Sequence, residues 1–358
     1  MSASTTFHPL RLAEVRPEAA DALVLGFEVP PALAETFAFA PGQHLSLRAT
    51  VNGEELRRSY SVCAAPGEPL RVGVRRVPGG AFSNWLHEQA RVGLALDVMP
   101  PQGRFGAALA AQQAGLRHVL AVAGGSGITP LLSIVKAVLA ADARTQCTLV
   151  YANRSLASMM FREELADLKN RHLTRLTLHP LFSREAVDQP LQAGHLDTER
   201  LQTLLRLSGP VDLAFVCGPL AMNDAVEAAL LQAGLPAAQI HTERFGVPAA
   251  ARVAAPAVPS TSTGAAVAVR VLRDGVARDI AYRTEDGDLL TAATRAGLDL
   301  PFSCRSGVCA TCRAKVVAGR VAMQRNFALE PDDVQAGFVL ACQAQPLDSG
   351  VVLSFDER

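Results

Sequence analysis

The chain has 358 residues, of which 49% are hydrophobic and 19% are charged, so it is long enough to form two or three packed domains. Its 34 basic residues balance its 34 acidic residues, and this neutrality gives no support for binding nucleic acid or an acidic membrane. No apolar run reaches the ~18–20 residues that cross a bilayer, and the N-terminus lacks the basic and apolar regions of a secretory signal, so we expect a cytoplasmic protein that does not bind membranes.

Residues 1–110 contain short runs of alternating apolar and polar residues separated by Pro and Gly, which predicts an antiparallel β-barrel. Two motifs there could bind a cofactor: Arg58-Ser59-Tyr60-Ser61 after a strand-like run, and Gly80-Ala81-Phe82-Ser83 at a predicted helix start. An arginine can neutralise a phosphate while a nearby tyrosine stacks on a planar ring. A glycine at a helix start leaves N–H groups free for a phosphate. Each motif alone is equally consistent with a surface arginine, a barrel tyrosine and an ordinary turn.

Residues 111–246 alternate strand-like apolar runs with helical patterns, which predicts a doubly wound α/β domain with a parallel sheet. The expected strands lie at 118–123, 147–152 and 213–217, and the expected helices at 131–140, 161–169 and 221–231. The first strand leads through Gly124-Gly125-Ser126-Gly127 into Thr129-Pro130. Glycines at such a turn let the backbone approach a pyrophosphate at a helix N-terminus. The pattern differs from the full G-x-G-x-x-G fingerprint, so alone it is only partial evidence for a nucleotide site.

The end of the second strand of this domain bears on the choice of nucleotide. The run Tyr151-Ala152-Asn153-Arg154-Ser155 contains no acidic residue. Enzymes that use NAD commonly place a carboxylate on the ribose hydroxyls, whereas an arginine accommodates the 2′-phosphate of NADP. Arg154 and Ser155 therefore favour NADPH, the alternative being an arginine that is simply exposed.

A segment rich in Ala, Pro, Ser and Thr at 247–265 has no periodicity and is predicted to be a linker. After it, residues 266–358 begin with two alternating runs around the turn Asp274-Gly275, which predicts a β-hairpin. A helix is expected at Asp288–Ala296, before a loop rich in cysteine. This order suits a small β-grasp ferredoxin domain.

Four cysteines in that last domain have the C-x₄-C-x₂-C spacing with a distant fourth member that is typical of plant-type [2Fe–2S] clusters. They are Cys304, Cys309, Cys312 and Cys342. Small residues between the first three leave backbone N–H groups free to point at the sulfurs. The alternative is zinc, but structural zinc sites usually contain two tight cysteine pairs or paired histidines. The spacing therefore predicts a [2Fe–2S] cluster held by these four thiolates.

The barrel motifs resemble those of the ferredoxin–NADP⁺ reductase superfamily. The matching residues are Pro41-Gly42-Gln43, Arg58-x-Tyr60-Ser61, Gly80-x-x-Ser83 and Pro101-x-Gly103-x-Phe105. The resemblance implies that Arg58 holds a flavin phosphate, that Tyr60 stacks on the isoalloxazine and that Ser61 bonds near flavin N5. It also implies that Gly80, Phe82 and Ser83 cap the pyrophosphate. No readable motif separates FAD from FMN, and we expect FAD.

The same resemblance extends through the nucleotide segment. It implies that Gly125, Gly127 and Thr129 belong to the loop that binds the nicotinamide nucleotide. It further implies that Cys217 and Gly218 frame the nicotinamide and that Glu243 lies near the flavin. For Cys217 the alternative of a buried cysteine without chemistry has almost equal weight.

The domain order resembles that of the reductase components of phenylacetyl-CoA epoxygenases, which are bacterial multicomponent di-iron monooxygenases. The resemblance runs nearly end to end and includes residues 54–61, 158–165, 307–312 and 319–331. It implies a reductase that passes electrons from NADPH through FAD and the [2Fe–2S] cluster to a di-iron oxygenase, with no residue acting as an acid or nucleophile. The alternatives are a reductase for a ring-hydroxylating or alkane oxygenase, and a non-catalytic metal-binding adaptor on a degenerate reductase scaffold.

Overall fold

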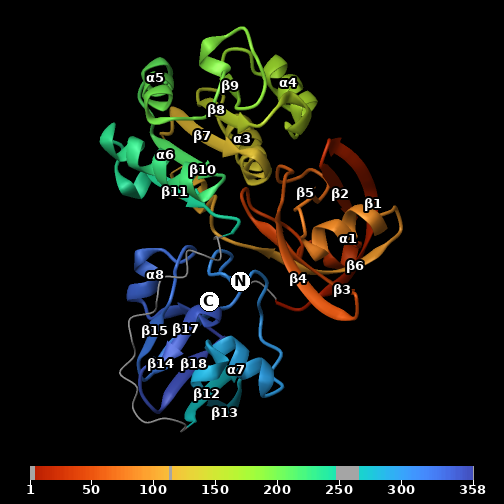
Figure 1. The fold of residues 1–358 in the computed structure, drawn as a ribbon, viewed down its shortest axis with the longest axis vertical. Coiled ribbons are helices and arrows are strands. Elements are labelled where there is room, and N and C mark those ends of the chain that lie inside the picture. The colour runs from red at the N-terminus through yellow and green to blue at the C-terminus, as the bar shows by residue number, and fades with distance from the viewer. Residues whose placement is uncertain (1–4, 113–114, 247–265, 358) are drawn as a thin grey trace. The chain divides into compact units, whose positions relative to one another are not determined.

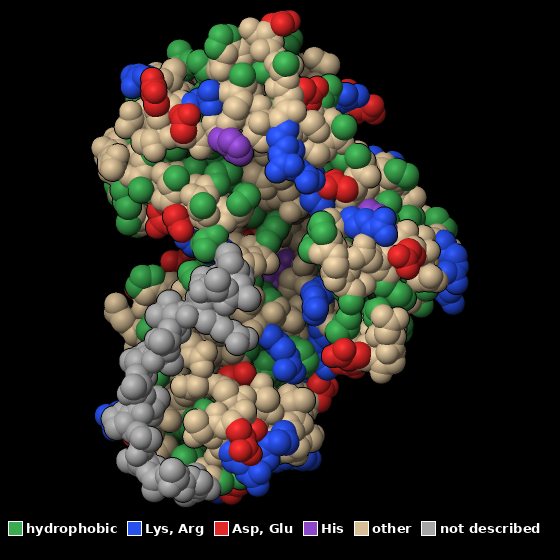
Figure 2. All heavy atoms as spheres, viewed as in Figure 1, with side chains coloured by type: hydrophobic (Ala, Val, Ile, Leu, Met, Phe, Trp, Pro, Cys, Tyr) green, Lys and Arg blue, Asp and Glu red, His purple; other side chains and the backbone are tan. Residues whose placement is uncertain are grey.

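The computed structural model describes residues 5–112, 115–246 and 266–357 (Figure 1). The described residues separate into two compact units, one made of those up to Phe245 and the other of Gly246 and residues 266–357. The predicted linker at 247–265 lies outside the described residues, so it stays a prediction. Within the described residues, no helix is both long and apolar enough to cross a membrane. Figure 2 shows basic and acidic side chains interspersed over the face in view, in keeping with the net charge of zero.

The first part of the larger unit is a six-stranded antiparallel sheet in the order β4-β3-β6-β1-β2-β5. Its strands are β1 (His8–Ala19), β2 (Ala22–Glu28), β3 (His44–Val51), β4 (Glu54–Ser61), β5 (Arg71–Arg75) and β6 (Ala95–Gln102), and helix α1 spans Ala81–Gln89. Beyond the end of β4, Val62 bridges to Val72 of β5, which joins the two edges of the sheet. Leucine and valine side chains on alternate strand positions fill the interior. The predicted antiparallel barrel is confirmed.

The second part of this unit is a five-stranded parallel sheet in the order β11-β10-β7-β8-β9. After a short helix α2 (Ala107–Gln112), its elements are β7 (His118–Gly124), α3 (Ile128–Ala141), β8 (Gln146–Asn153), α4 (Arg162–Arg171), β9 (Leu176–Phe182), α5 (Thr198–Ser208), β10 (Leu213–Cys217), α6 (Leu220–Gln232) and β11 (Ile240–Glu243). Helices α3 and α4 pack on one face of the sheet, and α5 and α6 on the other. Successive residues of β7 alternate between the two cores, as a strand buried on both sides requires. The predicted doubly wound fold is confirmed.

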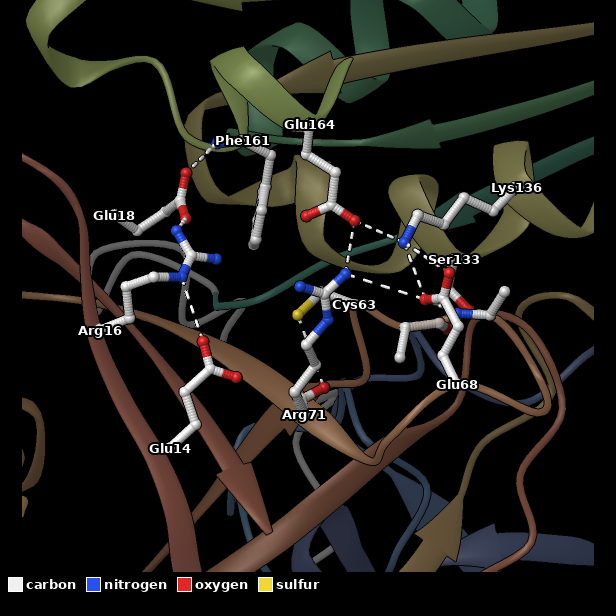
Figure 3. Close-up of polar contacts among 12 residues, drawn as sticks. Glu14, Arg16, Glu18, Cys63, Glu68, Arg71, Ser133, Lys136, Phe161 and Glu164 are labelled. Carbon is white, nitrogen blue, oxygen red and sulfur yellow. Dashed lines mark hydrogen bonds and ion pairs between the residues drawn. The ribbon is translucent and has the colours of Figure 1, made fainter. Parts of the chain in front are cut away.

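Ion pairs join the barrel to the α/β part of the unit (Figure 3). Lys136 of α3, whose side chain is only 7% exposed, lies 2.7 Å from Glu68 and also pairs with Glu164 of α4. Glu164 in turn pairs with Arg71 of β5. A charge removed from water is tolerated only when it is paired, so this network fixes the two parts against each other.

A second set of contacts places strand β5 against the beginning of α3. A Cβ atom added to Gly73 would lie 2.7 Å from Thr129 Cγ2 and 3.2 Å from Phe161 Cζ, so glycine is needed for this close approach. The backbone N–H of Phe161 donates to Glu18 of β1 at 2.6 Å (Figure 3). The barrel therefore meets the α/β part beside the glycine-rich turn.

The C-terminal unit contains a five-stranded mixed sheet in the order β13-β12-β18-β14-β16 and a two-stranded sheet of β15 and β17. Its elements are β12 (Val267–Arg273), β13 (Val276–Tyr282), α7 (Leu289–Arg295), β14 (Arg313–Ala318), β15 (Val321–Met323), α8 (Pro331–Gln335), β16 (Phe338–Leu340), β17 (Ala344–Pro346) and β18 (Val351–Ser354). Asp274 and Gly275 both have positive φ, as a two-residue hairpin turn requires. The predicted hairpin, helix and β-grasp arrangement are confirmed.

Candidate functional site

The two barrel motifs lie side by side in the folded chain. Tyr60 projects from β4, and its ring stacks on that of Phe82 in α1, with centroids 6.2 Å apart and planes inclined by 30°. Phe82 is 1% exposed and Tyr60 is half-buried. Burial raises the pKa of the Tyr60 hydroxyl, against a smaller opposing effect of Arg58. Two residues that are 22 positions apart thus form one aromatic surface.

The polar members of these motifs are partly used within the barrel. Arg58 is exposed, and its Nη1 donates to the carbonyl of Arg57 at 2.7 Å. The Ser59 hydroxyl lies 3.5 Å from that of Ser46. Ser83 Oγ accepts from the N–H of Val77 at 3.1 Å and therefore closes the turn before α1. Gly80 is the residue that precedes α1, as predicted.

Ser61, Cys217 and Glu243 come together where the barrel meets the carboxyl ends of β10 and β11. The Ser61 hydroxyl donates to Glu243 Oε2 at 3.5 Å. Cys217 and Glu243 are register partners on the two parallel strands. Burial raises the pKa of Glu243 to about 8, with a smaller opposing effect of the Ser61 hydrogen bond. Burial, and next the Glu243 carboxylate, raise the pKa of Cys217, so its thiol stays protonated at neutral pH.

The glycine-rich turn contains residues with different physical roles. A Cβ atom on Gly127 would lie 1.9 Å from the carbonyl oxygen of Cys217, and one on Gly218 would lie 3.0 Å from Gly124 Cα. These glycines therefore allow the turn to pack directly on the end of β10. Gly125 differs, because it has a φ of 55° and an added Cβ would meet nothing within 4 Å.

The residues that follow the glycine-rich turn are held in place by local hydrogen bonds. Thr129, in the first turn of α3, donates from Oγ1 to the carbonyl of Ser126 at 2.9 Å. The Tyr151 hydroxyl donates to the carbonyl of Gly125 at 3.0 Å. The turn is therefore braced from α3 and from β8 while the Cα of Gly125 faces open space.

Two carboxylates from distant parts of the sequence lie at the loop that contains Arg154 and Ser155. Arg154 Nη2 donates to Asp21 Oδ2 at 2.8 Å, although the arginine side chain is 53% exposed. Glu185, beyond β9, accepts from the N–H of Leu156. Ser155 caps the short turn that follows it. Asp21 lies 133 positions away from Arg154 in the sequence, and no local pattern indicates the contact.

The four cysteines of the last domain form two pairs. Cys304 and Cys309 lie five positions apart on one loop, and the N–H of Ala341 donates to the carbonyl of Cys312 at 3.0 Å, which brings the neighbouring Cys342 beside Cys312. The pKa of Cys304 is lowered to about 5, mainly by its hydrogen bond with Cys309, whereas the same bond and burial raise the pKa of Cys309. The N–H of Ser306 donates to the Cys304 sulfur at 3.4 Å.

The chemistry of this donor set fits the [2Fe–2S] cluster. Two irons with two thiolates each need two cysteine pairs. The residues between Cys304 and Cys312 curve the loop through positive φ at Arg305, Gly307 and Ala310. Among the described residues, no three His, Cys, Asp or Glu side chains are grouped as ligands of one metal ion. The paired thiols and the inward N–H of Ser306 are what a cluster requires.

Comparison with known proteins identifies each part of the chain. Residues 9–106 match the oxidoreductase FAD-binding domain family, residues 121–228 the oxidoreductase NAD-binding domain family, and residues 274–347 the 2Fe-2S iron-sulfur cluster binding domain family.

Similarity to individual proteins extends over almost the whole chain. The chain is 47% identical to one of the subunits of 1,2-phenylacetyl-CoA epoxidase from Escherichia coli (strain K12), covering 99% of both proteins. It is 34% identical to the ferredoxin reductase component of 3-ketosteroid-9-alpha-monooxygenase from Rhodococcus rhodochrous, covering 97% of this chain and 96% of that protein.

Among solved structures, phthalate dioxygenase reductase superposes with a TM-score of 0.59 at 24% identity, covering 98% of both chains, which supports the fold. The chain therefore belongs to the ferredoxin–NADP⁺ reductase superfamily, in the branch that carries a C-terminal [2Fe–2S] ferredoxin domain, and it is an electron-transfer oxidoreductase that uses FAD and a pyridine nucleotide.

Proposed function

We propose that this reductase supplies electrons from NADPH to a di-iron oxygenase that epoxidises phenylacetyl-CoA during phenylacetate degradation. The choice of this oxygenase as the electron acceptor, or client, rests on the end-to-end similarity, at 47% identity, to the 1,2-phenylacetyl-CoA epoxidase component described above. The proposal places the protein in the cytoplasm, where a reduced pyridine nucleotide and unpaired cysteines are both maintained.

The flavin site would be formed by the aromatic surface of Tyr60 and Phe82. When bound, FAD accepts two electrons as a hydride and releases them singly. Tyr60 would lie against the ring, because Phe82 already holds it in place. Arg58 would pair with the flavin phosphate, for which its exposed guanidinium is available. The N-terminus of α1, with Gly80 and Ser83, would lie against the pyrophosphate.

The hydride-transfer region would lie at Ser61, Cys217 and Glu243. Because burial raises the pKa of Glu243 to about 8, this side chain can hold a proton at neutral pH beside the Ser61 hydroxyl. Gly125 and Gly127 would bring the backbone to the nucleotide, with Thr129 at the start of α3 and Gly218 at the end of β10. Dry, packed surroundings at Cys217 would keep water away from the reacting carbon.

The choice of NADPH over NADH rests on Arg154 and Ser155. An arginine contact to a 2′-phosphate is charge-assisted and worth about 1.5–3 kcal/mol. Because the Arg154 side chain is 53% exposed, we take the lower end, which corresponds to about a tenfold preference. The four cysteines would hold the cluster, with Cys304 and Cys309 on one iron and Cys312 and Cys342 on the other.

The client is tested by reconstitution. The purified reductase is combined with the oxygenase component of phenylacetyl-CoA epoxidase, and NADPH-driven epoxide formation is measured. A parallel reaction with a steroid monooxygenase component tests the second client suggested by the 34% identical relative. Support of the steroid reaction without support of epoxidation would refute the proposed client, and a purified protein without flavin colour would refute the redox role.

A further inference from the structure

The turn between strands β1 and β2 is docked on the loop that follows β8. The N–H of Ala20 donates to the carbonyl of Ala157 at 3.1 Å. Beside it, Asp21 pairs with Arg154 at 2.8 Å. From β5, Arg75 Nη2 donates to the carbonyl of Ser158 at 2.5 Å. The Asp21 carboxylate of the barrel is therefore held against Arg154, the arginine predicted to bind the nucleotide.

We propose that Asp21 is a specificity-determining residue that competes with the 2′-phosphate of NADPH for Arg154. This inference rests on the proposed role of Arg154. In the structure the Asp21 carboxylate pairs with the Arg154 guanidinium. Binding of NADPH exchanges one anion for another, whereas NADH has no phosphate to make the exchange. Asp21 therefore reduces the preference for NADPH that Arg154 alone would give.

The surroundings of Asp21 lower the energetic cost of releasing Arg154 to a phosphate. Asp21 Oδ1 lies 3.5 Å from Arg75 Nη1, within ion-pair distance. Among the atoms that the structure describes, Asp21 Oδ1 and Arg75 Nε are both buried and neither has a hydrogen-bond partner. A small rotation of the carboxylate toward Arg75 Nη1 would give Asp21 Oδ1 a hydrogen-bond partner when Arg154 turns to a phosphate. Asp21 therefore has a second cationic partner in place, so its charge is not left unpaired.

The expected change in nucleotide affinity follows from the exposure of the Asp21–Arg154 pair. Half-exposed ion pairs contribute little because water and salt screen them. We therefore expect Asp21→Asn to strengthen binding of a 2′-phosphorylated nucleotide by about two- to fivefold. Binding of the unphosphorylated nucleotide should not change.

The test measures binding directly, with the full-length holoprotein and two probes. Adenosine 2′,5′-bisphosphate carries the 2′-phosphate, and adenosine 5′-monophosphate lacks it. Calorimetric dissociation constants are determined for wild type, Asp21→Asn, Arg154→Ala and the double variant. Asp142→Asn is the matched control, because it removes the same charge from another Asp–Arg pair. Asp142 pairs with Arg144 immediately before β8 begins, whereas Arg154 follows the end of that strand. Asp21→Ser, which keeps a turn-forming residue, replaces Asp21→Asn if that variant does not fold.

The expected result is tighter binding of the bisphosphate alone in Asp21→Asn, no such gain in the Arg154→Ala background, and no change in Asp142→Asn. If Arg154→Ala leaves bisphosphate affinity unchanged, the proposed role of Arg154 fails. If Arg154→Ala weakens binding but Asp21→Asn does not strengthen it, the competition fails and the NADPH proposal stands. An equal gain with and without Arg154, or in Asp142→Asn, would mean a general charge effect and overturn the role of Asp21.

Discussion

Substitution of two neighbouring glycines should separate packing from nucleotide binding. In Gly127→Ala the new Cβ would lie 1.9 Å from the carbonyl oxygen of Cys217. Because such contacts do not fall below 3.0 Å, α3 and the end of β10 must separate by about 1.1 Å (3.0 − 1.9). Overpacking of this kind costs about 1–3 kcal/mol. For a unit of this size it corresponds to a fall in Tm of about 2–4 °C per kcal/mol.

Gly125→Ala should act differently. Its Cβ would meet nothing within 4 Å, so only the left-handed backbone is penalised, by about 1–2 kcal/mol. In the proposed nucleotide site, however, the added methyl group would point into the space that we assign to the pyrophosphate. We therefore expect Gly125→Ala to raise the KM for NADPH at nearly constant kcat. Gly127→Ala should lower Tm by more and should reduce kcat as well.

The assay combines thermal unfolding of the holoprotein with NADPH–ferricyanide kinetics for both variants. Ferricyanide takes electrons from the flavin, so cluster function does not enter the measurement. If Gly127→Ala were as stable as wild type, the packing of the turn on β10 would be wrong. If Gly125→Ala bound nucleotide normally, the open space at Gly125 would have no role in binding.

Three further outcomes follow from the structure. Cys304→Ser should bleach the iron–sulfur absorption and abolish cytochrome c reduction while NADPH still reduces the flavin; an intact cluster would refute the ligand assignment. The neutral Glu243 carboxyl contributes stability that is lost as pH rises from about 4.5 to about 8. The Tm of Glu243→Gln should therefore rise relative to that of wild type over this range. A Tm difference that does not change with pH would contradict the raised pKa. Lys136→Met should cost about 1–3 kcal/mol in chemical denaturation, less than the ~3–5 kcal/mol of a fully buried pair, because Glu68 and Glu164 are 40% and 20% exposed and keep Arg71 as a partner. The exposed pair lost in Arg144→Met should cost less than about 1 kcal/mol, and equal costs would argue against the network.

Local patterns predicted the elements well because periodicity and turn chemistry are properties of neighbouring residues. The strand expected at 213–217 is β10, and the hairpin turn at Asp274-Gly275 has the positive φ values its sequence favours. The cysteine spacing similarly indicated four residues, of which three share one loop and the fourth, Cys342, is brought beside Cys312 by the pairing of β14 with β16.

Contacts across the fold could not be predicted in this way. The strand end at Tyr151–Ser155 contains no acidic residue, yet Asp21 and Glu185 reach its loop from other elements. Gly127 looked like a residue needed for a ligand, but its nearest constraint is the backbone of Cys217, 90 positions away. Such constraints arise from how the barrel and the sheet pack, which no single segment encodes.

We propose that electrons pass from NADPH to the flavin and only then to the cluster. Anaerobic stopped-flow mixing with NADPH, with flavin and iron–sulfur absorption recorded separately, tests this order most directly. Flavin bleaching should come first, cluster reduction should follow, and Cys304→Ser should retain only the first phase. Cluster reduction that precedes flavin bleaching, or that proceeds at full rate in protein stripped of flavin, would contradict the claim.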